Sequence, residues 1–363
     1  MFVFVCVRCG AELTAPLSRV ALPAHARQKY GNGLQLPVLM EPGTFAVDPG
    51  LWGPPRRRWE EIDPDGAAVR GVDAPVHAPS EDPAAAVVIA PGDTRGTVLI
   101  PEKRGGACCG FDGSDGPNMA CLACGLLVAS RVDDCSLWQA VRLAPDAVRR
   151  LPVEGADAGL LTWAELLAEG AGVPPSEPIA RWGEPFGASD RWHWSPQWVA
   201  AAGQALAHLL VASEGRAVAV RDGLTVTMFQ RDLDTLLPDG PPTRHAVLAG
   251  PGHPARDADA DILIVPSHPQ TGLAWTPPTP AHLVPLPFGV WLRLVLPEPQ
   301  LSVPASGPLA KDVLREDPPP PRVHDVFRVD WEVFRDTLAR LPAARTPWLR
   351  EIAEDPTGHS SRP

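Results

Sequence analysis

Hydrophobic positions in the first part of the chain fall in short runs that proline and glycine interrupt. The clearest of these runs are residues 34–40, 86–90, 97–100 and 126–132. Apolar runs of this length, bounded by turn-forming residues, are typical of β-strands. The pattern therefore predicts a β-rich first half with long loops.

Helical patterns are confined to the middle and the end of the chain. The clearest covers residues 196–212, with Ser195 as N-cap, Pro196 in the first turn, and apolar residues on one stripe at Val199, Leu206, Leu209 and Leu210. A shorter helix is expected at 163–167 after Thr162, and another at 331–341 after Asp330. These caps fix where each helix should begin.

Further strands are expected between the helices. Residues 217–220 and 224–229 flank Asp222-Gly223, a pair typical of a hairpin turn. Other strand candidates are 245–248, 262–265 and 290–296. The second half is therefore expected to mix helices and strands.

These patterns predict an α+β protein with a β-rich first half that contains a long insertion, a mixed α/β second half and a short helical C-terminus. The expected parts are residues 1–145, a domain with an inserted β-rich subdomain, and 146–300, a mixed α/β domain. A proline-rich linker or arm follows at 301–325, and C-terminal helices at 326–354.

Charge and hydropathy narrow the choice of partners. The formal net charge of −11 argues against a nucleic-acid backbone as the main partner, because that binding depends on Lys and Arg. A local basic patch remains at Arg56, Arg57 and Arg58, between Trp52 and Trp59, although acidic residues follow it. The first residues contain no signal peptide, and no apolar run approaches the roughly 20 residues that cross a bilayer. A cytoplasmic location, without a membrane partner, is expected.

All seven cysteines lie before residue 136, and four of them form two groups of the same shape. Cys6 and Cys9 precede Gly10, and Cys121 and Cys124 precede Gly125. A Cys-x-x-Cys turn followed by glycine presents two thiolates from one tight bend, and two such turns complete a tetrahedral metal site.

These two turns resemble the knuckles of the zinc-ribbon and rubredoxin-like families. The resemblance covers the turns and their flanking apolar strands, and it implies that Cys6, Cys9, Cys121 and Cys124 bind one structural Zn²⁺, with iron as the alternative metal. The spacer between Cys9 and Cys121 is 111 residues, longer than is usual in a ribbon, so a subdomain must be inserted between the knuckles.

The other three cysteines, Cys108, Cys109 and Cys135, admit three interpretations. They are buried small apolar side chains, which is the interpretation favoured here, or they hold a second metal together with a histidine such as His25 or His77. One of the first two could also replace a ligand of the first site. Nearby Asp112, Asp115 and Asn118 mimic a calcium loop, but the pattern fits loop-capping roles better.

Candidates for catalysis are weak. Two clusters deserve mention: one around His193, and one that brackets residues 262–265 and comprises His253, Asp257, Asp259, Asp261 and His268. Phosphate-binding, nucleophile-elbow, zinc-protease and deaminase motifs are missing from the sequence.

The sequence thus favours a zinc-binding protein that acts as a binding or scaffold protein through contacts with a protein partner. The first alternative is an enzyme or small-molecule-binding protein with a site between the two halves. The second alternative is a nucleic-acid-binding zinc-ribbon protein. The partner and the oligomeric state do not follow from the sequence.

Overall fold

The computed structural model describes residues 1–29, 36–49, 63–69, 71–74, 86–155, 159–170, 178–180, 193–221, 223–255, 260–278, 280–296 and 326–354. Several expected features lie outside this part of the chain. These are Arg56–Arg58, His77, Asp257, Asp259, residues 34–35 of the expected strand 34–40, and the proline-rich segment 301–325. Among the helices of the described part, none combines the length and apolar character that a bilayer crossing demands.

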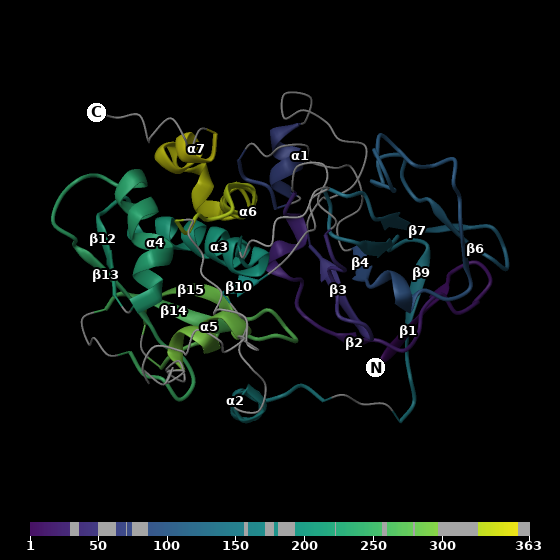
Figure 1. Cartoon of the computed structure of the whole chain (residues 1–363), viewed down its shortest axis with the longest axis horizontal. Coiled ribbons are helices and arrows are strands. Elements are labelled where there is room, and N and C mark those ends of the chain that lie inside the picture. Colours follow the sequence, from purple (N-terminus) through teal and green to yellow (C-terminus); the bar gives the residue numbers. More distant parts are fainter. Residues whose placement is uncertain are drawn as a thin grey trace, which may run out of the picture.

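The first half is built on a seven-stranded sheet with the strand order β2-β3-β4-β8-β7-β6-β5 (Figure 1). Its strands are β2 (Ser18–Arg19), β3 (Thr44–Asp48), β4 (Ala86–Ile89), β5 (Thr97–Leu99), β6 (Met119–Cys121), β7 (Leu127–Val132) and β8 (Ala140–Leu143). The β2–β3 pair is parallel and every other pair of neighbours is antiparallel. The expectation of a β-rich first half is confirmed.

A separate two-stranded ribbon lies against this sheet. It pairs β1 (Phe2–Cys6) with β9 (Val148–Pro152) in antiparallel register, so that Cys6 stands opposite Val148. Residues of both strands share a core with one face of the large sheet, where Phe4 packs edge-on against Phe45. The opposite face carries its own smaller core around Trp138. Successive side chains of a strand point to opposite faces of the sheet, so β3, β4 and β8 each contribute residues to both cores.

The second half contains a four-stranded parallel sheet with the order β12-β13-β14-β15. Its strands are β12 (Val218–Val220), β13 (Arg244–Leu248), β14 (Ile262–Ser267) and β15 (His282–Pro287), and its helices are α3 (Pro196–Ser213), α4 (Gly223–Leu236) and α5 (Phe288–Val295). Both faces of the sheet are buried, with Ile262 and Ile264 toward one core and Leu263 and Val265 toward another. Parallel sheets usually have this two-sided burial.

The C-terminal helices belong to the same large core. They are α6 (Trp331–Leu338) and α7 (Pro347–Glu354), joined by the 3-10 turn η4 (Pro342–Arg345). Helix α6 packs along α3, where Gly203 allows a close approach: a Cβ there would lie 2.4 Å from the Asp330 carbonyl oxygen. Figure 1 shows α6 and α7 stacked above α3 in this view.

The remaining short elements connect these parts. They are η1 (Ala24–Arg27), α1 (Pro64–Val69), η3 (Pro91–Asp93), α2 (Trp163–Gly170), and the two-stranded pair of β10 (Ile179–Ala180) and β11 (His193–Trp194). The two halves touch directly near η1. Gln28 donates from its side chain to the Pro196 carbonyl at 2.8 Å, and an Arg27 nitrogen lies 3.0 Å from an Asp336 carboxylate oxygen.

The capped helices begin where the sequence places them. The Asp330 carboxylate accepts a hydrogen bond from the Val333 amide at 2.9 Å, and Thr162 accepts one from the Glu165 amide at 3.3 Å. Helix α3 begins at Pro196, but the Ser195 hydroxyl bonds the Gln197 side chain and makes no cap hydrogen bond. Pro196 in the first turn sets where this helix begins, and the burial of most of its residues stabilises it.

Two expected strands are helices, and both predictions were wrong. Residues 224–229 lie in α4, which begins at Gly223, and residues 290–295 lie in α5. In α4 the buried residues recur at helical spacing, from Thr225 through Met228 and Phe229 to Leu233. In α5 the Trp291 ring N–H donates to the Ala249 carbonyl at 2.9 Å, which holds the helix on the sheet.

Candidate metal centre

The two Cys-x-x-Cys-Gly segments fold into the same turn. In the first, the Gly10 amide donates to the Cys6 carbonyl at 2.9 Å, and in the second the Gly125 amide donates to the Cys121 carbonyl at 2.8 Å. Both glycines have positive φ, 76° and 73°, a conformation that side chains disfavour. The glycine after each pair is therefore required by the turn.

A second hydrogen bond repeats across the two turns. The Cys6 amide donates to the Ala11 carbonyl at 2.9 Å, and the Cys121 amide donates to the Leu126 carbonyl at 2.8 Å. Each turn thus closes onto the segment that leaves it. The repetition shows that the two segments are a pair of equivalent knuckles, as their shared pattern predicts.

The sheet topology brings the two knuckles together despite their separation in sequence. The first follows β1 and the second joins β6 to β7. Each knuckle is also hydrogen-bonded to a neighbouring segment of the fold. The Val7 amide donates to the Ala147 carbonyl at 3.1 Å, and the Leu122 amide donates to the Gly96 carbonyl at 2.8 Å. The described part of the intervening chain forms β2, β3, β4 and β5, which belong to the same sheet as β6 and β7.

The four sulfur atoms of Cys6, Cys9, Cys121 and Cys124 all lie within 4.8 Å of one another. The Cys6–Cys124 and Cys9–Cys121 sulfur separations are both 3.6 Å. A tetrahedral ion with metal–sulfur bonds of about 2.3 Å needs sulfurs about 3.8 Å apart. The four sulfurs are therefore close enough to one another to hold one metal ion.

The surroundings of the four thiols differ. Cys6 and Cys121 are buried above the core that β1 shares with the sheet, Cys124 is half-buried and Cys9 is exposed. Burial raises the pKa of the Cys6 thiol, but hydrogen bonds from the Cys9 and Arg8 amides, with the Cys124 thiol, lower it to about 7. Amides directed at sulfur in this way stabilise thiolates and are expected of metal ligands.

The pKa of Cys9 moves in the opposite direction. The Ala11 amide lowers it, whereas burial and the thiols of Cys124, Cys121 and Cys6 raise it, and the net value is about 12. Opposite shifts arise because the thiols share one small volume, so that ionisation of one opposes ionisation of the next. A cation removes this repulsion, which is why such a cluster binds metal with release of protons.

The other three cysteines do not join this group. Cys108, Cys109 and Cys135 gather elsewhere, with Asp134 as the fourth member. The favoured interpretation, that all three are buried, is wrong for Cys108 and Cys109, which are exposed, while Cys135 is buried. His25 is not a ligand either, since its ring is buried against Trp138 with the centroids 4.4 Å apart.

Asp134 is the residue that the sequence reasoning missed. It stands in a plain Asp133-Asp134-Cys135 run, and a carboxylate beside a cysteine was the available signal. Burial raises its pKa, but the Ser136 hydroxyl and the amides of Cys109 and Ser136, with the Cys108 thiol, lower the pKa to about 2. This carboxylate is therefore ionised over the whole physiological range.

The calcium-like loop is held by its own hydrogen bonds. Asp112 accepts from the Ser114 amide at 2.8 Å and Asp115 accepts from the Gly105 amide at 2.8 Å. Asn118 exchanges two hydrogen bonds with the Arg131 backbone, at 2.7 and 2.9 Å. These side chains cap the loop, as expected.

The candidate catalytic residues are not brought together. Asp261 and His268 flank β14, and a strand of this length, at about 3.3 Å per residue, separates them by about 20 Å. Asp261 pairs with Arg244 at 2.7 Å, and His268 bonds the Leu161 carbonyl at 2.8 Å through Nε2. His253 lies edge-on to Trp291, and Trp194, next to His193, lies edge-on to Phe327. The described members of these clusters thus contact separate parts of the fold.

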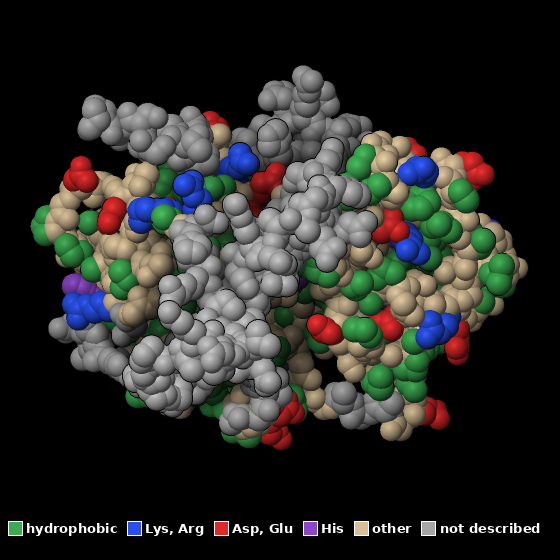
Figure 2. Space-filling view, in the orientation of Figure 1, with side chains coloured by type: hydrophobic (Ala, Val, Ile, Leu, Met, Phe, Trp, Pro, Cys, Tyr) green, Lys and Arg blue, Asp and Glu red, His purple; other side chains and the backbone are tan. Residues whose placement is uncertain are grey.

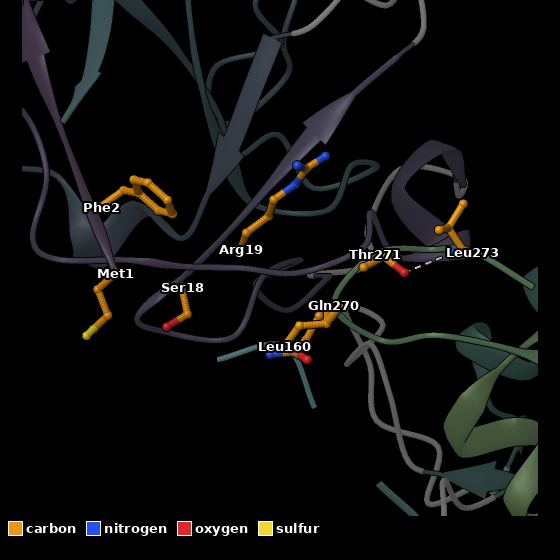
Figure 3. Close-up of a pocket in the computed structure, with 8 residues that line it drawn as sticks. All are labelled: Met1, Phe2, Ser18, Arg19, Leu160, Gln270, Thr271 and Leu273. Carbon is orange, nitrogen blue, oxygen red and sulfur yellow. Dashed lines mark hydrogen bonds between the residues drawn. The ribbon is translucent and has the colours of Figure 1, made fainter. Parts of the chain in front are cut away.

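A pocket of about 540 Å³ does lie between the two halves (Figure 3). Its lining comprises Met1, Phe2, Ser18 and Arg19 from the first half and Leu160, Gln270, Thr271 and Leu273 from the second. In Figure 3 the Thr271 hydroxyl turns to the Leu273 amide, and the side chains surround the space loosely. Arg19 is the one ionisable side chain among these eight, so the lining offers no acid–base pair.

Charged side chains on the visible face are interspersed. Figure 2 shows basic, acidic and hydrophobic side chains alternating over the knuckle-bearing half, without a continuous basic patch on that face. Arg8, which lies between the two cysteines of the first knuckle, donates a hydrogen bond to the Cys124 carbonyl at 3.4 Å. It therefore braces the opposite knuckle.

The fold and this geometry define a class: an α+β protein with cysteine clusters able to hold a metal ion. Comparison with protein-family models, curated proteins and solved structures finds no match. The functional argument therefore depends on the geometry alone.

Proposed function

We propose that this chain is a zinc-binding protein that acts through protein contacts, with its first half folded around a structural Zn²⁺ ion on Cys6, Cys9, Cys121 and Cys124. The observation that carries the proposal is the convergence of four sulfurs, from two equivalent knuckles, within 4.8 Å. Four thiolates fill a tetrahedron and leave no position for substrate, which is typical of structural zinc. An iron centre uses the same ligands, and metal analysis separates the two.

Exposed apolar side chains around the knuckles support the protein-contact part of the proposal. Val7 is 48% exposed and Leu122 is 70% exposed, and each occupies the position after the first cysteine of its knuckle. Val98 and Leu127, on the strands that flank β6, stand opposite Ala120 and are also exposed. Exposed apolar groups on a rigid surface favour a protein partner with its own apolar patch.

The metal is tested by elemental analysis and by exchange of one ligand. Cys124→Ser should remove the ion of this site and release the β1–β9 ribbon from the large sheet, because structural metal binding supplies folding free energy. Ala123→Ser, the same new hydroxyl one residue earlier in the same exposed turn, should keep the ion and the fold. Hydrogen exchange of residues 1–155 and zinc per chain report the result. A Cys124→Ser protein with unchanged metal content and unchanged protection would refute the proposal.

The contact surface is tested with Leu122→Glu. This exposed change should leave zinc content and thermal stability as in the wild type, because Leu122 contributes little to the core. A protein that co-purifies in fixed ratio with the wild type should be lost from the variant, while Leu273→Glu, equally exposed on the second half, should retain it. Partner capture that is the same for both variants would remove this surface from the proposal.

A further inference from the structure

Cys108, Cys109, Asp134 and Cys135 gather at the other end of the β6–β7 hairpin. Cys108 and Cys109 lie in the loop that leads into β6, and Asp134 and Cys135 follow the end of β7. Because β6 and β7 are antiparallel, these two segments meet at one end of the hairpin, whereas the second knuckle forms its other end. The six residues of β7, at about 3.3 Å each, place the two groups about 20 Å apart.

The donor atoms of this second group, one from each residue, lie within 4.8 Å of one another. The Cys108 and Cys135 sulfurs are 3.3 Å apart, and the sulfurs of Cys108 and Cys109 are each 3.5 Å from one Asp134 carboxylate oxygen. For zinc, with bonds of about 2.3 Å to sulfur and about 2.0 Å to oxygen, a tetrahedron has sulfur–oxygen edges of about 3.5 Å and sulfur–sulfur edges of about 3.8 Å. The group needs only small adjustment to hold an ion.

Hydrogen bonds hold these donors in place. The Asp134 oxygen that faces the thiols accepts from the amides of Cys108 and Cys109 at 3.1 and 3.3 Å, and its other oxygen accepts from the Ser136 hydroxyl at 3.0 Å. The Cys135 amide donates to the Cys109 sulfur at 3.2 Å. An amide directed at sulfur repeats the feature of the first site that favours a thiolate ligand.

The backbone also brings the two segments close together. The Phe111 amide donates to the Asp133 carboxylate at 2.8 Å, and the Asp133 amide donates to the Phe111 carbonyl at 2.9 Å. Gly110 permits this approach, because a Cβ there would lie 2.5 Å from the Asp133 carboxylate and 2.6 Å from its carbonyl oxygen. The cysteine pair is therefore positioned by the fold before any ion binds.

We propose that Cys108, Cys109, Cys135 and Asp134 form a second metal site, which takes one divalent ion of the zinc class. Three thiolates exclude Ca²⁺ and Mg²⁺, which prefer oxygen ligands. Binding releases the three thiol protons to solvent and leaves a centre of net charge −2, because Asp134 is already ionised. Two of the sulfurs are exposed, so this ion exchanges faster than the ion of the first site.

The first experiment counts zinc in the full chain, purified anaerobically under a phosphine reductant. The wild type should hold two zinc ions per chain, Cys108→Ser one, Cys124→Ser one, and the double variant none. Ala107→Ser, the same hydroxyl next to Cys108 in the same loop, should hold two. Cys108 is exposed, so its replacement leaves the fold intact.

The second experiment identifies the ligands. After replacement of zinc by ¹¹³Cd²⁺, the wild type should give two resonances, one in the position of four thiolates and one shifted toward that of three thiolates with oxygen. Cys108→Ser should abolish only the second resonance, and Asp134→Asn should move or abolish only the second.

The proposal is overturned by a wild type that holds one ion which Cys124→Ser alone removes. It is equally overturned by a Cys108–Cys135 disulfide in the anaerobically purified protein, detected by mass spectrometry. Either result leaves the first site standing. Conversely, loss of the first site would appear as a wild type whose one ion is removed by Cys108→Ser and kept by Cys124→Ser.

Discussion

Different features stabilise the two halves of this molecule. The second half has a large apolar core on one face of its sheet, which includes the fully buried Trp198, Trp291, Phe229 and Phe334, and a small core on the other face. The first half divides its apolar residues between two cores that are each smaller than that large core, and it contains all seven cysteines. Burial of apolar surface in one large core stabilises the second half, whereas the first half has thiol clusters at both ends of one hairpin.

This difference explains why one knuckle follows β1 and the other joins β6 to β7. The β1–β9 ribbon has only two strands, and an isolated pair of strands is marginally stable in water. The knuckle after β1 ties the ribbon to the β6–β7 hairpin of the larger sheet. The proposed ion would join two sheets whose named strands do not pair with each other in the described part of the chain.

The largest effect expected from a change in the second half is that of Trp291→Ala. The ring is fully buried and its N–H donates to the Ala249 carbonyl, so the change leaves a cavity and an unpaired acceptor. We expect a loss of about 3–5 kcal/mol in the free energy of unfolding of this half, measured by urea denaturation. Zinc content should not change, and this separates the two sources of stability.

Leu273→Ala is the control for that measurement. Leu273 is 70% exposed, so its truncation should change the free energy of unfolding by no more than about 0.5 kcal/mol. If Trp291→Ala also releases the metal of the first half, the two halves unfold as one unit. The comparison between them would then fail.

A smaller effect is expected from acid, through His25 in the first half. Burial lowers the pKa of His25 to about 4, from an ordinary value of 6.5. Between those values the unfolded chain binds a proton that the native protein does not, so stability is complete above about pH 6.5 and falls as the pH drops toward 4. The loss by pH 4 is about 3 kcal/mol, at about 1.4 kcal/mol per pKa unit.

The variant His25→Gln tests this pH dependence. The free energy of unfolding of zinc-loaded protein is measured with urea from pH 7 to pH 4.5. Its slope against pH should be smaller in the variant, by an amount that corresponds to close to one proton bound on unfolding. His208→Gln should flatten it in the same direction for the second half, since burial lowers the pKa of His208 to about 4 as well. A slope unchanged in His25→Gln would show that this ring does not resist protonation in the native state.

Local signals in the sequence located several elements correctly. Asp330 and Thr162 cap their helices because each side chain bonds an amide within three residues, which requires no distant partner. Each knuckle is equally local, since Gly10 and Gly125 adopt the positive φ that closes the turn. Interactions of this range can be read directly from neighbouring residues.

Two segments were assigned to the wrong structure for a common reason. Residues 224–229 are rich in β-branched and aromatic residues, and 290–296 form a short apolar run, so both fit a buried strand or a buried helix. Packing decided between them: Thr225, Met228 and Phe229 reach the large core from one side of α4, and Trp291 reaches the Ala249 carbonyl from α5. Whether such a segment forms a strand or a helix depends on the surface of the protein against which it packs.

The sequence by itself determined the ligand types, the paired knuckles and the starts of the capped helices, because each depends on residues a few positions apart. Only the tertiary structure decided that Cys6 and Cys9 meet Cys121 and Cys124, and that Asp134 joins Cys108, Cys109 and Cys135. Convergence across a long spacer is set by strand order and register. These depend on burial summed over the whole sheet, a quantity that no short segment contains.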